Sequence, residues 1–168
     1  SLLTALMLQR APMIVAVLIG LGVGIVFGAV NGIILTKCRI PAFIVTLGTS
    51  SVYTGIARAM TNLEAVSVTN NTFTHYFGSG NIGFIPTLFL WTIILTLIGQ
   101  YVYKKTSFGR AVLAVGGNES SARYSGINTD RVKFWSMVIC GAAAACAGIL
   151  YAGRMHGARY TYGENDSM

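Results

Sequence analysis

A charge-free apolar run from residue 12 to 35 constrains the fold more than any other feature of this sequence. As a helix, such a run crosses a hydrocarbon core of about 30 Å at a rise of about 1.5 Å per residue. Charged residues make up only 10% of the chain, whereas soluble domains carry about 25%. The sequence therefore predicts an all-α, polytopic helical membrane protein.

Three further apolar segments follow this run, so we expect about four transmembrane helices. The later segments span roughly residues 42–60, 84–103 and 134–153, and a long loop over 104–133 separates the last two. The segment 42–60 is the least typical, because hydroxyl side chains and glycines interrupt it. It is either a full span or a tilted or broken helix that its neighbours shield from lipid.

The basic residues indicate how these segments are oriented. Six of the 12 lie in the 104–133 loop, Lys37 and Arg39 lie in the turn after the first segment, and residues 61–83 contain none. With four spans, both basic connections face the cytoplasm, as the positive-inside rule requires. This agreement supports 42–60 as a true span. The net charge of +7 then reflects topology, and we expect no nucleic-acid partner.

Glycines at every fourth position form a stripe along the first segment. They are Gly20, Gly24, Gly28 and Gly32. Small residues let helix backbones approach closely in lipid, so the stripe predicts a partner helix on this face. The alternative is a glycine face that lines a pore. Asn31 either bonds across to another helix or contacts a solute.

Hydroxyl side chains gather near one face of the second segment. Thr46, Thr49, Ser50 and Tyr53 are its members. Such a face can line a hydrated cavity for a polyol. The alternative is that the Ser and Thr hydroxyls bond back to carbonyls of their own helix.

The 104–133 loop is expected to hold one short helix between glycine hinges. Asn118 is a good N-cap, Glu119 suits a first helical turn, and Gly126 can end the helix. A helix over about 119–125 on the basic face is suited to docking a soluble partner. Alternatively, it lies on the membrane surface and only anchors the chain.

No catalytic machinery is evident from the sequence. There is no nucleotide-binding loop, no nucleophile with a plausible base, and no cysteine spacing typical of a metal site or a disulfide framework. We therefore expect a protein that is not an enzyme, with no catalytic residue, no metal ligand and no bound cofactor.

Several motifs together resemble a known family. They are GAVNG (28–32), RIPAFIVTLGT (39–49), FGR (108–110), AVGGNE (114–119), AR (122–123) and SGIN (125–128). In order and spacing they resemble the permease subunits of bacterial ABC sugar importers, especially the ribose, xylose and galactoside group within the branched-chain amino acid permease superfamily. Members of that family continue beyond the position that matches Asp166, so residues 1–168 resemble a partial permease transmembrane domain.

The resemblance implies a multi-pass protein of the bacterial cytoplasmic (inner) membrane that imports a monosaccharide such as ribose, xylose or galactose. A separate ABC ATPase subunit would use ATP–Mg. An extracytoplasmic sugar-binding protein and a second permease copy, identical or different, would complete the machine within the lipid bilayer. The alternatives are a permease for branched-chain amino acids or nucleosides, and a small helical membrane scaffold without transport activity.

The resemblance and the local chemistry assign two sets of site residues. The set expected to couple to the ATPase is Gly109, Arg110, Asn118, Glu119, Ala122, Arg123 and Gly126. The set expected near the translocation path is Asn31, Thr46, Gly48, Thr49 and Ser50.

Overall fold

A computed structural model of the chain describes residues 4, 7, 12–38, 40–61, 66–67, 81–82, 85–154 and 157–158. These residues contain six helices: α2 (Met13–Cys38), α3 (Ala42–Thr61), α5 (Thr87–Lys105), α6 (Ser107–Gly117), α7 (Glu119–Tyr124) and α8 (Thr129–Arg154). Two antiparallel pairs of two-residue strands accompany them, β1 (Val66–Ser67) with β4 (Gly157–Ala158) and β2 (Asn81–Ile82) with β3 (Ile85–Pro86). The predicted all-α fold class is confirmed.

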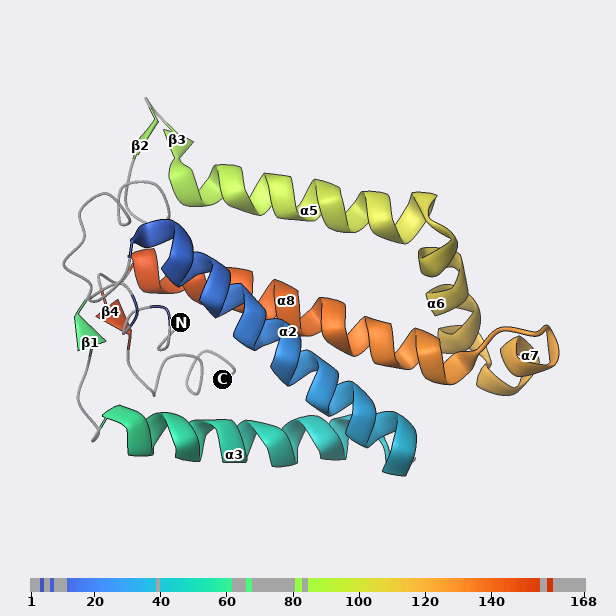
Figure 1. The fold of residues 1–168 in the computed structure, drawn as a ribbon. Helices are drawn as coiled ribbons and strands as arrows, with labels where there is room; N and C mark the ends of the chain where they lie inside the picture. Colours follow the sequence, from blue (N-terminus) through green and yellow to red (C-terminus); the bar gives the residue numbers. More distant parts are fainter. Residues whose placement is uncertain are drawn as a thin grey trace.

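The four long helices α2, α3, α5 and α8 run along the length of the molecule (Figure 1). The turn between α2 and α3, the end of α5 and the start of α8 all lie at the end that carries α6 and α7, and the short strands lie at the opposite end. The two predicted basic connections therefore share one end of the bundle.

Three of these helices, α2, α5 and α8, are long and apolar enough to cross a membrane. The predicted count was about four. Helix α3 has 20 residues and is not among these three, because hydroxyl side chains and glycines interrupt its apolar residues. It is one continuous helix, so the broken-helix alternative is wrong. Its place as a fourth span stays a prediction.

The predicted boundaries need correction around the 104–133 region, which is not one loop with a single short helix. Helix α5 continues to Lys105, α6 occupies 107–117, and α8 begins at Thr129 rather than 134. The Thr106 hydroxyl caps α6 by accepting from the Gly109 N–H at 3.1 Å. The Asn128 side chain caps α8 by accepting from the Arg131 N–H at 3.0 Å. These caps allow helices to begin among polar residues that the sequence analysis assigned to a loop.

Helix α8 is the neighbour that α2 contacts most extensively. A Cβ at Gly28 would lie 2.5 Å from the Met137 carbonyl oxygen, and one at Gly24 would lie 2.7 Å from the Gly141 carbonyl oxygen. Real Cβ atoms essentially never come this close to other atoms. The middle of the glycine stripe therefore lies directly against the backbone of α8.

The ends of the stripe are also occupied. A Cβ at Gly32 would lie 2.9 Å from Cδ2 of Phe134, and one at Gly20 would collide with the Thr4 hydroxyl. Large apolar side chains on the other faces of the helices are exposed, as expected for surfaces that meet lipid or further helices.

Candidate translocation cavity and coupling helices

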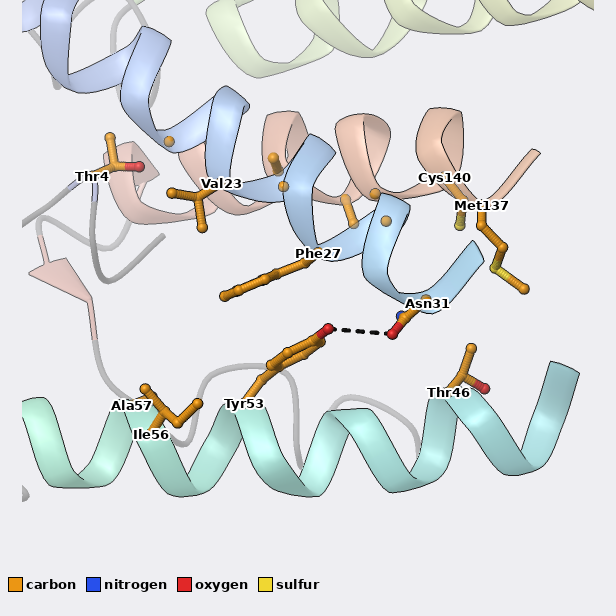
Figure 2. A pocket seen from close by; sticks show the side chains of 16 residues that line it. Thr4, Val23, Phe27, Asn31, Thr46, Tyr53, Ile56, Ala57, Met137 and Cys140 are labelled. Atoms are coloured by element: carbon orange, nitrogen blue, oxygen red, sulfur yellow. Dashed lines mark hydrogen bonds between the residues drawn. The ribbon is translucent and has the colours of Figure 1, made fainter. Parts of the chain in front are cut away.

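A cavity of about 430 Å³ lies between α2, α3 and α8 (Figure 2). Its side-chain lining includes Val23, Phe27 and Asn31 from α2, Thr46, Tyr53, Ile56 and Ala57 from α3, and Met137 and Cys140 from α8. Among the described residues, those that line this cavity are all uncharged. The cavity therefore offers apolar surface with a few neutral polar groups.

Tyr53 bridges the two helices that face each other across the cavity. Its hydroxyl donates a hydrogen bond to Oδ1 of Asn31 at 3.2 Å. Its ring stacks on Phe27 with 4.1 Å between ring centroids and 11° between ring planes. Figure 2 shows both rings in the space between α2 and α3. Side chains, rather than backbone contacts, join α3 to α2 here.

Thr4 contributes a further polar group to the lining, close to Gly20. The residue is only 1% exposed, and within the described part of the chain its hydroxyl oxygen has no hydrogen-bond partner. An unpaired buried hydroxyl costs about 1–3 kcal/mol. This hydroxyl is therefore a buried polar group at the edge of the cavity.

The residues predicted for the translocation path divide into two groups. Asn31 and Thr46 line the cavity, whereas the structure does not bring Gly48, Thr49 and Ser50 to it. The Thr49 hydroxyl donates to the Val45 carbonyl at 2.9 Å and the Ser50 hydroxyl to the Leu47 carbonyl at 2.8 Å. A Cβ at Gly48 would meet no atom within 4 Å.

Thr46 also bonds to its own helix, donating to the Ala42 carbonyl at 3.1 Å and the Phe43 carbonyl at 3.0 Å. The alternative offered for the hydroxyl face, bonding back to the helix, thus describes these Thr and Ser side chains. The Phe27–Tyr53 stack is a feature that the sequence analysis missed. Tyr53 was placed on the hydroxyl face, but no local signal pairs it with an apolar residue of another helix.

At the other end of the molecule, α6 turns sharply away from α5. Gly109 is buried, and a Cβ there would lie 2.7 Å from the Val102 carbonyl oxygen. Only a residue without a side chain fits this corner. Arg110 is exposed and donates to the Ser107 hydroxyl at 3.0 Å within the first turn of α6.

Helix α7 has the caps that the sequence predicts. Oδ1 of Asn118 accepts from the Ser121 N–H at 3.0 Å. At the other end Gly126 has a φ of +83°, and the Ile127 N–H donates to the Ala122 carbonyl at 3.1 Å. A second bond, from the Gly126 N–H to the Arg123 carbonyl, completes a Schellman motif. The short helix is thus a defined unit, and Ala122 lies on its buried face.

Two polar contacts join α7 to α8. The Lys133 ammonium lies 2.6 Å from the Glu119 carboxylate, and this hydrogen bond lowers the pKa of Glu119. Arg123 donates to the Thr129 hydroxyl at 3.1 Å and lies 3.6 Å from the Asp130 carboxylate. Both Glu119 and Arg123 border a groove of about 620 Å³ that also touches the α2–α3 turn, α6 and α8.

A family of permease components of branched-chain amino acid transport systems matches residues 1–165 of the chain. The chain belongs to this family. It is accordingly a multi-pass protein of the bacterial inner membrane, and the family is described as a permease component of transport systems. The predicted resemblance to ABC sugar permeases is confirmed by the relatives described next.

Curated relatives include the ribose import permease protein RbsC of Escherichia coli (strain K12), 36% identical over 89% of this chain and 48% of the relative. The D-allose transport system permease protein AlsC of the same strain is 34% identical over 82% of this chain and 41% of the relative. The RbsC protein of Bacillus subtilis (strain 168) is 31% identical over 98% of this chain and 52% of the relative. The chain thus spans about half the length of the curated relatives it matches. No solved structure matches it.

Proposed function

We propose that the chain forms part of the membrane-spanning permease subunit of an ATP-driven importer that carries a monosaccharide such as ribose, xylose or galactose. The observation that carries this proposal is the set of relatives named for ribose, allose and arabinose, which are all neutral sugars. The solute would pass along the cavity between α2, α3 and α8.

The chemistry of the cavity favours a sugar over a branched-chain amino acid. A zwitterionic amino acid would bring an ammonium and a carboxylate next to apolar surface, and the described lining residues offer no opposite charge. A sugar needs only neutral hydrogen-bond partners, which Asn31 and Thr46 provide. A nucleoside is also neutral and is the remaining alternative solute.

The partners in this proposal are an ABC ATPase subunit that uses ATP–Mg, an extracytoplasmic sugar-binding protein and a second permease copy. Helix α7 is the proposed coupling helix. Because Glu119 and Arg123 join α7 to the start of α8, a push on α7 would reach α8 directly. Helix α8 would carry α2 with it through the glycine contacts, while α3 would stay on the far side of the cavity.

ATP-dependent uptake tests this proposal. The permease is reconstituted in proteoliposomes with its ATPase and binding protein, and uptake of radiolabelled D-ribose, D-xylose, D-galactose, L-leucine and adenosine is measured. The control is the same assembly with an ATPase variant that cannot hydrolyse ATP. Sugar uptake that requires hydrolysis is expected. Uptake of leucine or adenosine alone would show that the carried solute is that compound and not a sugar. Failure to co-purify with any ABC ATPase would favour the scaffold alternative.

A further inference from the structure

Tyr53 fills a position in the cavity that a ring-shaped solute with hydroxyl groups would also fill. Its ring lies flat against Phe27 at 4.1 Å, and its hydroxyl, at the edge of that ring, donates to Oδ1 of Asn31. A flat ring with one donor at its edge matches the outline of a sugar that rests its C–H face on Phe27 and donates a hydroxyl to Asn31.

Resting on the proposed function, we propose that Tyr53 is a gate and a selectivity residue that holds the solute's place until the solute displaces it. The entering sugar takes over both the Phe27 face and the Asn31 acceptor. The phenol then swings away with α3, and the α2–α3 side of the cavity opens.

The exchange keeps the Asn31 acceptor paired, while the Tyr53 hydroxyl gives up its bond to Asn31. One hydrogen bond to Asn31 replaces another, and one contact with the Phe27 face replaces another. A leucine that rests its alkyl side chain on Phe27 offers no ring hydroxyl to Asn31, and its ammonium would meet a lining without an opposite charge. A site built around a hydrogen bond discriminates strongly against solutes that lack the donor. Tyr53 therefore selects polyhydroxylated rings as well as closing the path.

The interface around Tyr53 has room for this movement. Helix α3 contacts α2 much less than α8 does, and the open cavity of about 430 Å³ lies next to the stacked rings. Movement of Tyr53 away from α2 together with α3 breaks no backbone contact of the kind that joins α2 to α8.

A native thiol reports the state of this gate. Cys140 lines the same cavity from α8 and is a free cysteine with an exposed side chain, so its modification reports whether water and a charged reagent enter the cavity. A negatively charged methanethiosulfonate reacts with a thiolate in water and not with a thiol in lipid. Cys38, a free and exposed cysteine at the end of α2, lies outside the cavity lining and serves as the internal reference.

The rate of Cys140 modification is measured in membranes that contain the protein, by mass spectrometry of the cysteine peptides and relative to Cys38. Tyr53→Ala, which removes the ring and the hydroxyl, should raise the rate by at least about tenfold. Tyr53→Phe keeps the stack and loses one hydrogen bond, so it should raise the rate by about two- to tenfold. Tyr101→Phe, the same change on the exposed face of α5, should leave the rate unchanged.

Asn31→Ala removes the other half of the same hydrogen bond. It should raise the rate as much as Tyr53→Phe does, and the double variant should show no further increase, because the two changes remove one interaction. Additive effects would overturn the gate. So would an unchanged Cys140 rate in Tyr53→Ala; if that variant does not fold, the Tyr53→Phe and Asn31→Ala pair decides.

The gate and the proposed function fail in different ways. If Tyr53 variants raise the Cys140 modification rate but the protein takes up no sugar, the gate is supported and the proposed solute is wrong. If the protein takes up sugar but the Cys140 modification rate is the same in all Tyr53 variants, the proposed function is supported and the gate is overturned.

Discussion

The two helices that flank α2 are held against it in different ways. Helix α8 meets α2 backbone to backbone: a Cβ at Gly141 would lie 2.8 Å from the Gly28 Cα. Helix α3 meets α2 through side chains, with the Phe27–Tyr53 stack and the hydrogen bond from Tyr53 to Asn31 across an open cavity.

The difference indicates which contact can open. Lipid provides no hydrophobic force between helices, so association depends on close packing and polar contacts. A backbone contact has no rotamer that releases it without loss of packing, whereas a side-chain bridge opens when one side chain rotates. We therefore expect α2 and α8 to move as one body and α3 to move against them.

The largest effect is expected where the two backbones meet. Gly28→Leu would put a branched side chain where even a Cβ lies 2.5 Å from the Met137 carbonyl oxygen, and overpacking of this kind costs about 3 kcal/mol or more. The fraction of folded protein in mild detergent, measured by size-exclusion chromatography and thermal unfolding, should fall steeply. Gly22→Leu on the same helix, where a Cβ would meet no atom within 4 Å, is the matched control. Equal behaviour of the two variants would show that the glycine stripe does not hold α8.

A smaller effect is expected on the side-chain bridge to α3. Phe27→Ala removes one ring of the stack, and aromatic pairs contribute about 0.5–1.5 kcal/mol beyond burial of their area. The variant should therefore fold, with a free energy of unfolding that falls by about 1 kcal/mol more than in an exposed Phe→Ala control, measured by thermal unfolding in detergent. Phe89→Ala on the exposed surface of α5 is the control. A loss as large as that of Gly28→Leu would contradict the distinction between the two interfaces.

The sequence predicted one side of the tight α2–α8 interface. The spacing of Gly20, Gly24, Gly28 and Gly32 predicts a close partner, because glycines four apart share one helix face. The identity of that partner was not predictable. Gly141 and Ala145 of α8 are also four residues apart, but they lie in a segment so rich in Ala and Gly that no single stripe stands out. The side-chain bridge between α2 and α3 was not predictable, because Phe27 and Tyr53 come together only in the tertiary structure.

The coupling region shows the same division between local and distant signals. Asn118 and Gly126 predict α7 because caps are local chemistry, and both take their predicted roles. Helix α6 was missed because its glycines were interpreted as hinges. Gly109 instead permits a close backbone approach to α5, and Gly117 is the last residue of α6. The start of α8 was placed too late because charged residues were assigned to the loop.

A third class of contact, the exposed polar bridge between α7 and α8, extends the comparison. Arg123→Glu would lose the bond to Thr129 and face Asp130, but both charged side chains of the pair are 58% exposed. The loss of stability should therefore stay below about 1 kcal/mol, with membrane insertion intact. Association with the ATPase, measured by co-purification, should weaken about tenfold if α7 is the coupling helix. Arg131→Glu, the same charge change on α8, is the control, and an equal loss of association in both variants would point to charge alone.

The smallest effect is expected at the Glu119–Lys133 pair, where the contact is short but exposed. The hydrogen bond from Lys133 and the nearby positive charges of Lys133 and Arg123 lower the pKa of Glu119 below its ordinary 4.5. A depressed pKa in the folded state stabilises α7 against α8 above pH 4.5, and this contribution is lost as the pH falls through the folded-state pKa. Carbon-13 NMR titration of the Glu119 carboxyl should give a midpoint below 4.5 that rises in Lys133→Gln. Ser120→Ala beside it should leave the midpoint unchanged. If Lys133→Gln does so as well, the ion pair does not join α7 to α8, and the coupling helix depends on Arg123 and its caps alone.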